Sequence, residues 1–340
     1  MTVMMPTIKD VARLANTSKS TVSRFLNGKP VKKDTELALR KAIEELNYHP
    51  NMNARRLVLN RTQVVGIVVE DISNNFFTPI LKGIRDEFDR KGYECVFYTW
   101  NLNRRREVDF MKLLYEEQVD GLIFVSFTRR SREDVRLMCD APFPVVLIGD
   151  HAGVNEIYSI DVDNANGVHE VVNYLYRIGH RKIAHIAGPE HAGAGLEREH
   201  GFREAMLNHG ISADLALIVQ SDWTHQGGYN AMKALLEVGG FTAVVASNDE
   251  SAIGAIGAAH EHGYSIPRDF SIVGFDDIGI SQWIYPPLTT VRQPFQETGR
   301  RAAEVLYRAM VDEEATAAPR ILLKPELVIR NSCLHVQTDG

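Results

Sequence analysis

Residues 7–28 read TIKDVARLANTSKSTVSRFLNG, and they predict two short amphipathic helices joined by a three-residue turn. Apolar residues recur at i, i+3 and i+4 in each half, starting at Val11 in the first and at Val22 in the second. Thr7 and Ser18 are residue types that cap helix N-termini, and Asn27-Gly28 tolerates the left-handed conformation that ends a helix. We therefore predict a helix-turn-helix unit at the start of the chain.

The outward face of the second helix is rich in short or cationic hydrogen-bonding side chains: Lys19, Ser20, Thr21, Ser23 and Arg24. These are the side chains that a helix needs to reach base edges and phosphates in the major groove of DNA. Any small helical bundle also has polar outer faces, so this pattern alone leaves both interpretations open.

The distribution of charge favours the DNA interpretation. Residues 1–62 hold 12 Lys and Arg against 5 Asp and Glu, a net charge of +7, and the other 278 residues hold 26 against 39, a net charge of −13. The overall charge of −6 therefore conceals a basic segment followed by an acidic one. Such asymmetry suits a segment that binds a polyanion while the rest of the chain is repelled from it.

From Val64 onward the pattern changes to short apolar runs that alternate with helical periodicity. The alternation predicts right-handed βαβ units, a parallel sheet and two doubly wound lobes. Strands are expected at 64–69, 93–98, 121–125, 145–148, 182–187, 243–246 and 271–275, and helices around 80–88, 110–115, 166–178, 198–209, 226–237 and 250–262.

Three segments together resemble the lactose/galactose repressor (LacI/GalR) family: Thr7–Gly28, Ala42–Asn51 and Ala54–Leu57. The resemblance implies a helix-turn-helix head over residues 1–49 that binds double-stranded operator DNA, with Lys19, Ser20 and Arg24 reading bases. Further DNA contacts are expected, from these features and the resemblance together, at Thr7, Ser18, Thr21, Ser23, Asn27, Lys33, Tyr48, Asn51, Ala54, Arg55 and Leu57. Asn16 departs from the usual turn glycine, and Lys32 from the usual Ser cap of a third helix.

Residues 50–62 are expected to form a hinge helix or linker. Pro50 can precede a helix and Asn51 can cap one, but Met52–Asn60 is too short to be a stable isolated helix in water. We expect it to fold only against DNA and a second copy of the chain. By resemblance, Leu57 is the wedge that enters the minor groove and kinks the DNA.

Residues 63–340 are expected to form an effector-binding and dimerisation core. By its resemblance to periplasmic sugar-binding proteins, the chain crosses between two lobes near 162, 290 and 324. One lobe then comprises about 63–162 and 291–323, and the other about 163–290 and 324–340. Ligands of such folds bind at the carboxyl ends of the strands, in the cleft. The side chains that follow successive strands, together with the family's inducer positions, give the expected effector site: Phe76, Phe77, Asp150, Arg198, Trp223, Asn248 and Asp276.

Several motifs that could indicate a nucleotide, metal or redox site do not support one. Gly188–Gly195 lacks the Lys-Ser/Thr of a P-loop and is interpreted as a flexible cleft loop. His260 and His262 point apart on a helix, and the three cysteines lack metal or redox spacing. We expect no catalytic residue, cofactor or metal, and no signal peptide or membrane span, which together predict a cytoplasmic protein that is not an enzyme.

The resulting hypothesis is a sugar-responsive transcriptional repressor that acts as a homodimer on a pseudo-palindromic operator. Two alternatives keep the DNA-binding class but replace the sugar inducer with a purine corepressor or with a phosphorylated protein. Ala192 and Ala194 stand where a purine-binding member carries polar side chains, which argues against a purine. The third alternative is a soluble sugar-binding or sugar-modifying protein with an incidental helical head.

Overall fold

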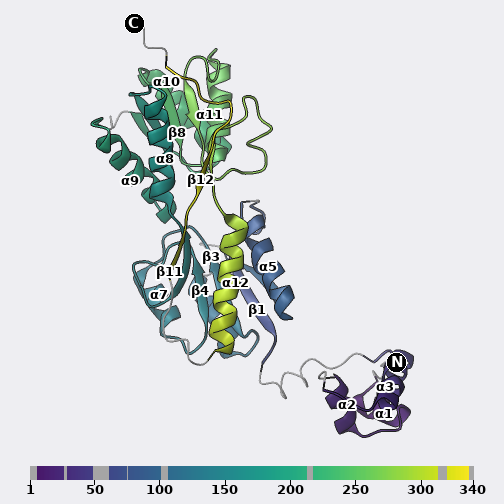
Figure 1. Ribbon diagram of the computed structural model, residues 1–340. Coiled ribbons are helices and arrows are strands. Elements are labelled where there is room, and N and C mark those ends of the chain that lie inside the picture. Colours follow the sequence, from purple (N-terminus) through teal and green to yellow (C-terminus); the bar gives the residue numbers. More distant parts are fainter. Residues whose placement is uncertain are drawn as a thin grey trace. The chain divides into compact units, whose positions relative to one another are not determined.

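The computed structural model describes residues 6–26, 29–48, 61–74, 76–100, 106–212, 217–312 and 320–336. The chain divides into two compact units, a head of residues 1–63 and a core of residues 64–340 (Figure 1). The predicted fold class, a helix-turn-helix head followed by an α/β core of parallel sheets, is confirmed.

Three helices form the head: α1 (Ile8–Leu14), α2 (Lys19–Leu26) and α3 (Lys33–Glu45). Val11, Val22 and Leu39, one from each helix, are fully buried against one another. The apolar spacing in the sequence therefore marks the faces that meet in the core of the head.

Local hydrogen bonds fix the two helix starts and the turn of the head. The Asp10 carboxylate accepts from the backbone N and the hydroxyl of Thr7 at 2.9 and 2.7 Å. Ser18 Oγ accepts from the Thr21 backbone N at 3.1 Å, as its capping role predicts. Asn16 has a φ of 46°, so the turn does require the left-handed conformation that glycine usually supplies.

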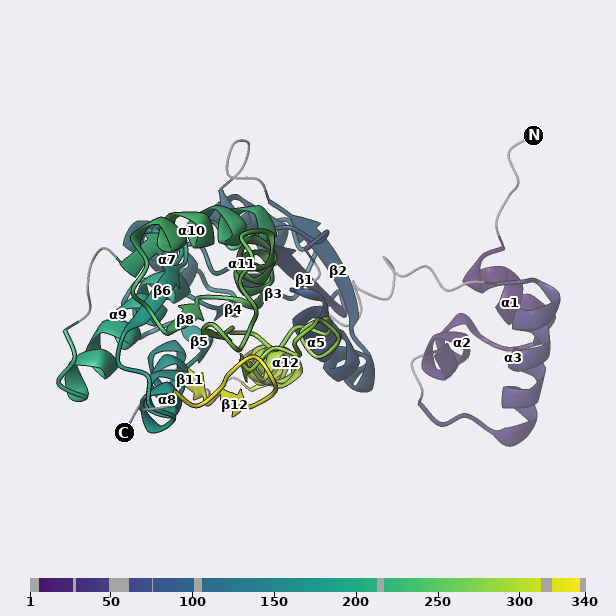
Figure 2. The ribbon, with the colours of Figure 1, turned by 90° about the horizontal axis from the view of Figure 1, so that it is seen from above.

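The first lobe of the core, the N-lobe, is built on a six-stranded parallel sheet in the order β11-β5-β4-β3-β1-β2. Its strands are β1 (Val64–Val69), β2 (Glu94–Thr99), β3 (Gly121–Val125), β4 (Val145–Ile148), β5 (Tyr158–Val162) and β11 (Arg320–Leu323). Its helices are α5 (Thr78–Lys91), the 3-10 helix η1 (Glu107–Met111), α6 (Lys112–Tyr115), α7 (Arg132–Cys139) and α12 (Phe295–Val311). Figure 2 shows α5 and α12 side by side, and apolar residues of both pack on one face of the sheet.

The second lobe, the C-lobe, has a four-stranded parallel sheet in the order β7-β6-β8-β9. Its strands are β6 (Ile183–Ala187), β7 (Ile218–Gln220), β8 (Ala243–Ala246) and β9 (Ser271–Val273). Its helices are α8 (Asn164–Arg177), α9 (Gly193–Asn208), α10 (His225–Val238) and α11 (Asp249–Glu261). An antiparallel pair, β10 (Thr290–Arg292) and β12 (Glu326–Val328), lies where the chain enters and leaves this lobe.

The chain passes between the lobes three times, as Figure 1 shows. It leaves the N-lobe after β5 at Asp163, returns after β10 through Gln293-Pro294, and crosses again after β11 through Lys324-Pro325. Each lobe is therefore assembled from segments that are distant in sequence.

Most of the expected elements of the core are present, with some differences in extent. The strands expected at 64–69, 121–125, 145–148 and 243–246 have those bounds in the structure. The helix expected at 198–209 instead begins at Gly193, so the end of the glycine-rich stretch is helical and not loop. The strand expected at 271–275 ends at Val273.

Two glycines allow α10 and α11 to pack closely. A Cβ at Gly254 would lie 1.9 Å from the His225 carbonyl oxygen, and one at Gly228 would lie 2.1 Å from the Ser251 carbonyl oxygen. Backbone atoms of a packed helix cannot move aside easily, so these positions admit only glycine. Gly257, on the same helix as Gly254, has open space around it and is exposed.

We predict opposite effects of alanine at these two positions of α11. Gly254→Ala lowers the free energy of unfolding by about 1–3 kcal/mol, because the helices must separate. Gly257→Ala raises it by about 0.5–1 kcal/mol, because alanine reduces the backbone freedom lost on folding. Urea unfolding measures both changes, and equal effects of the two substitutions contradict the packing described.

Candidate functional site

A cavity of about 320 Å³ lies between the two lobes of the core, at the carboxyl ends of their strands. The N-lobe lines it with Glu70, Asp71, Asn74, Phe76, Phe77, Phe127 and Thr128. The C-lobe lines it with Pro189, His191, Ala192, Ala194, Arg198, Asp222, Trp223, Thr224, Asn248, Glu250, Asp276 and Ile278. The volume is at the lower end of the range for small-molecule sites, about 300–1,000 Å³.

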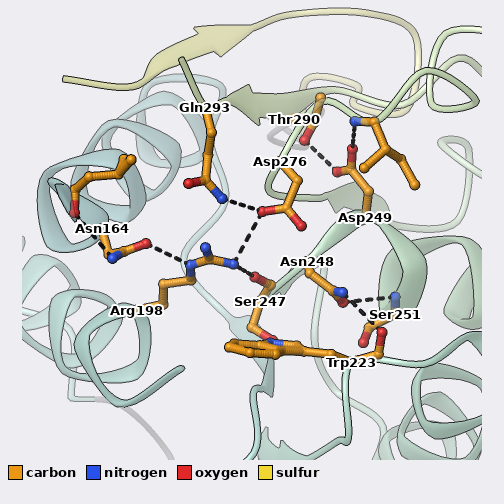
Figure 3. Close-up of polar contacts among 12 residues, drawn as sticks. Asn164, Arg198, Trp223, Ser247, Asn248, Asp249, Ser251, Asp276, Thr290 and Gln293 are labelled. Atoms are coloured by element: carbon orange, nitrogen blue, oxygen red, sulfur yellow. Dashed lines mark hydrogen bonds and ion pairs between the residues drawn. The ribbon is translucent and has the colours of Figure 1, made fainter. Parts of the chain in front are cut away.

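Arg198 on α9 is the central polar group of the cavity wall, and its side chain is only 3% exposed. Its Nε donates to Asn164 Oδ1 at 3.0 Å, and its Nη1 donates to the Ser247 carbonyl at 2.5 Å and to Asp276 Oδ1 at 3.4 Å (Figure 3). The guanidinium also lies 3.9 Å from the centre of the Phe275 ring. Burial lowers the pKa of Arg198, and the Asp276 carboxylate opposes that shift.

Asp276 follows β9 and completes this network. Its Oδ1 also accepts from Gln293 Nε2 at 2.6 Å. Burial raises the pKa of Asp276 to about 6, against the opposing effect of Arg198 and Gln293, so the carboxylate is mainly ionised at neutral pH. The network thus joins α9 to Asn164 and Gln293, which lie at the first and second lobe crossings.

Two residues that line the cavity have backbones in the left-handed half of conformational space. Trp223 has a φ of 66° and Asp276 a φ of 120°. Such conformations are costly for residues other than glycine, and they persist where surrounding contacts impose them. Trp223 is held by two contacts: its Nε1 donates to Ser247 Oγ at 3.0 Å, and its carbonyl accepts from Asn248 Nδ2 at 3.0 Å.

Asp249 lies behind the cavity wall and is fully buried. Its carboxyl group accepts hydrogen bonds from the Ile278 backbone N at 2.9 Å, the Ser281 hydroxyl at 2.6 Å and the Thr290 hydroxyl at 2.5 Å. Burial, with the nearby Asp276 charge, raises the pKa of Asp249 to about 8. The group is therefore mostly protonated at neutral pH, and it links α11 to the start of the second crossing.

Aromatic rings form the N-lobe side of the cavity. The Phe76 ring makes edge-on contacts with Phe295, Phe127 and Phe77, at centroid distances of 4.7, 5.3 and 5.5 Å. Trp223 lies in the lining contributed by the C-lobe. Apolar ring surfaces and hydrogen-bonding groups thus line one small space.

Six of the seven residues expected at the effector site line the cavity: Phe76, Phe77, Arg198, Trp223, Asn248 and Asp276. Asp150 differs, because it is not among the lining residues. Its carboxylate accepts from the backbone N of Arg130 at 2.9 Å and of Ala152 at 2.8 Å, so it shapes the turn after β4. Arg130 forms a buried ion pair with Glu107 beside it.

Several lining residues were not in the expected set, although they obey the same rule of position. Glu70 and Asp71 follow β1, Phe127 and Thr128 follow β3, and Asp222 follows β7. Position after a strand is the signal that identifies them. Gly188 also has a defined role, because a Cβ there would lie 2.5 Å from Trp223 Nε1.

The head presents most of its expected DNA contacts to solvent. Thr7, Ser18, Lys19, Ser20, Arg24 and Lys33 are exposed, and Thr21 and Ser23 are partly exposed. Arg24 Nη2 donates to the Pro30 carbonyl at 3.4 Å, a long contact. Lys32, as its departure from serine predicts, caps α3 without a side-chain hydrogen bond.

Tyr48 differs from the other expected contacts, because only 8% of it is exposed and it packs in the hydrophobic core of the head. Asn27, Asn51, Ala54, Arg55 and Leu57 lie outside the described residues. So do residues 50–60 of the expected hinge segment.

Comparison with known proteins decides the family. A family model described as bacterial regulatory proteins, lacI family, matches residues 7–51, and one described as a periplasmic binding protein-like domain matches residues 172–333. The HTH-type transcriptional repressor CytR of Escherichia coli (strain K12) is 34% identical over 328 residues, 96% of both chains. The chain belongs to the lacI family of bacterial regulatory proteins.

Solved structures agree with this assignment. A lac repressor dimer bound to operator and the anti-inducer ONPF superposes with a TM-score of 0.87 at 26% identity, covering 97% of this chain and 99% of that one. The regulator CelR in complex with cellobiose gives a TM-score of 0.73 at 32% identity, covering 96% and 99%. This chain is accordingly a DNA-binding transcriptional regulator. None of the helices in its described part has the length and apolarity needed to cross a membrane.

The buried carboxyl group of Asp249 generates a prediction about pH. Its pKa is about 8 in the folded chain and near the ordinary 3.8 when unfolded, so the folded state binds the extra proton between these values. Stability therefore falls as pH rises from about 4 to about 8. Asp161 and Asp276, with pKa values raised to about 7 and 6, act in the same direction.

Asp249→Asn should flatten this dependence, on the order of 1 kcal/mol per pH unit, because the substituted side chain does not titrate. Urea unfolding of both chains at pH 5, 6.5 and 8 tests the difference. Parallel stability profiles would show that the Asp249 carboxyl group is ionised in the folded protein.

Proposed function

We propose that this lacI-family regulator represses carbohydrate-metabolism genes, and that a small sugar bound between the lobes changes its operator affinity. The supporting observation is the Arg198 and Asp276 network, which faces aromatic rings across a cavity of suitable size. Carboxylate, amide and guanidinium groups hydrogen-bond sugar hydroxyls, and ring faces pack on the apolar side of a sugar. The related CelR was solved with cellobiose, which makes a sugar the natural class of ligand.

The contacts of the network support a mechanism based on linkage. A ligand on Arg198 and Asp276 touches groups bonded directly to Asn164 and Gln293, where the chain crosses between the lobes. Because the N-lobe supplies the opposite wall, the ligand stabilises one angle between the lobes over another. That angle sets the positions from which two copies present their hinge segments, including Leu57, to the operator. The ligand changes DNA affinity only by its differential affinity for the two states.

We further propose a homodimer formed through the core. A head of three helices makes few base contacts, so two heads on a pseudo-palindromic operator give a more specific complex. Three apolar side chains of the segment after β9 are prominently exposed: Ile280 (50%), Trp283 (77%) and Tyr285 (87%). Large apolar side chains exposed to this extent within six residues of sequence favour an interface between proteins.

A purine corepressor is the second candidate ligand, and the cavity lining weighs against it. Ala192 and Ala194 present methyl groups at the start of α9, and neither can hydrogen-bond the edge of a base. Control by a phosphorylated protein would leave the buried Arg198 network without a role in regulation.

The Asp276 carboxylate provides the test of the sugar site. Asp276→Asn keeps the size of the side chain and an oxygen for Arg198 and Gln293, but removes a charge-assisted acceptor from the ligand. We expect the sugar concentration that releases half of the operator to rise by at least about tenfold. The affinity for operator in the absence of sugar should stay unchanged. Fluorescence anisotropy of operator DNA selected by the wild-type chain gives both values.

Asp140→Asn, an exposed aspartate at the end of α7, is the matched control and should release as the wild type does. If Asp276→Asn also releases operator at wild-type sugar concentrations, the ligand binds elsewhere.

The exposed face of α2 provides the test of DNA recognition. Lys19→Ala should weaken operator binding by about 1–3 kcal/mol and weaken binding to random duplex less, because it removes a base-reading group. Lys41→Ala removes the same charge from an exposed position on α3 and serves as the control. Equal losses for the two variants, on both DNAs, would mean that Lys19 contributes only to the general charge of the head.

A further inference from the structure

We infer that the interlobe cavity takes an uncharged sugar and rejects sugar acids and sugar phosphates. This inference rests on the proposed function, because it names the chemical class of ligand for the same site. It follows from two properties of the lining residues: the balance of their charges and the balance of their hydrogen-bond donors and acceptors.

Carboxylates dominate the ionisable groups of the lining. Glu70 and Asp71 come from the N-lobe, and Asp222, Glu250 and Asp276 from the C-lobe. Against these five acids, the described lining residues include one arginine, Arg198, and one histidine, His191. The acids lie on both sides of the cavity, so a bound ligand faces carboxylates in either orientation.

The charge of Arg198 does not offset this excess. The Asp276 carboxylate pairs with its guanidinium at 3.4 Å, and both side chains are less than 5% exposed. Its Nε and Nη1 are already directed at Asn164 and the Ser247 carbonyl. An incoming anion would therefore compete with a resident carboxylate for a group that is already neutralised.

Four donors of the cavity lining are used within the protein. Trp223 Nε1 donates to Ser247, and the Thr128 and Thr224 hydroxyls donate to Glu70 and Asp222. The amide of Asn248 donates to the Trp223 carbonyl. Among the described lining residues, Arg198 Nη2, the Asn74 amide and the His191 ring keep donor groups for a ligand, so a ligand that can only accept has these to bind and no others among its charged or amide-bearing neighbours except the second N–H of Asn248.

Acceptors, in contrast, remain available. Asp222 uses Oδ1 for the Thr224 hydroxyl and backbone N, and Asp71 uses Oδ1 for the Ser73 hydroxyl and backbone N. Asp276 likewise receives Arg198 and Gln293 on Oδ1. Each of these carboxylates keeps its second oxygen for a ligand, as far as the described residues show. Hydroxyl groups can donate to such oxygens, whereas an ionised carboxylate or phosphate cannot.

The experiment compares sugars that differ in one group. Each neutral aldohexose is tested by calorimetry on the full chain beside its uronic acid and its 6-phosphate, and operator release is followed in parallel. We expect binding and release with a neutral sugar, and at least about tenfold weaker binding of its uronic acid and its 6-phosphate, because five carboxylates line the cavity and repel an anion.

Variants show whether the carboxylates cause the selectivity. Asp222→Asn and Glu250→Gln should each reduce the ratio of the affinity for the neutral sugar to the affinity for its uronic acid. Asp140→Asn removes one charge from a distant surface of the core and should leave the ratio unchanged.

The possible failures are distinguishable. A uronic acid or sugar phosphate that binds as tightly as its neutral partner, or a ratio that the two cavity variants leave unchanged, overturns the inference while the sugar-responsive function stands. Absence of binding and release with every sugar, charged or neutral, overturns the proposed function itself.

Discussion

A buried guanidinium is the physical constraint around which the effector-binding core is organised. Removing Arg198 from water is unfavourable unless acceptors surround it. The structure supplies them from three places: Asn164 at the start of α8, the Ser247 carbonyl after β8 and Asp276 after β9. These positions fix α9 against the carboxyl edge of the C-lobe sheet. The same atoms form one wall of the cavity, so the structural requirement and the ligand site share one set of residues.

The location of this network gives the cavity its influence over the rest of the core. Asn164 follows the first lobe crossing, and Gln293, which bonds Asp276, stands in the second. Asp249 adds a further link, because it holds Thr290 just before that crossing. A ligand that draws the two lobes together must therefore act through residues that also hold the connections between them. Strain at Trp223 and Asp276 is concentrated in the same place.

Much of this organisation can be predicted from the sequence, because hydrophobic periodicity is a local property. The short, continuous apolar runs at 64–69 and 121–125 are typical of internal strands, and both have those bounds in the structure. Their position after expected strands also identifies Asn248 and Asp276, the partner of Arg198, as residues of the cavity. The start of α9 is harder to predict, because Gly193 and Gly195 are poor helix formers. A Cβ at Gly195 would lie 3.1 Å from the Pro189 carbonyl oxygen, a close approach that only the folded chain reveals.

Side-chain partners are a tertiary property, and there the sequence is insufficient. Asp150 follows a strand as expected, yet the neighbouring Arg130 and Ala152 engage its carboxylate, and it does not line the cavity. Tyr48 is an expected DNA contact by the family resemblance, but it packs in the hydrophobic core of the head. The excess of carboxylates in the cavity likewise emerges only when residues from both lobes are brought together.

The central claim is that one cavity and one DNA-binding surface are coupled, and reciprocity tests it most directly. The affinity of the chain for its sugar should be measured free and with saturating operator, and its operator affinity with and without saturating sugar. Because a homodimer on one operator carries two cavities, linkage requires the operator affinity to change by the square of the factor by which the affinity of each cavity for sugar changes. That relation is the predicted result, and a sugar affinity unchanged by operator, alongside sugar-induced release, would contradict the account.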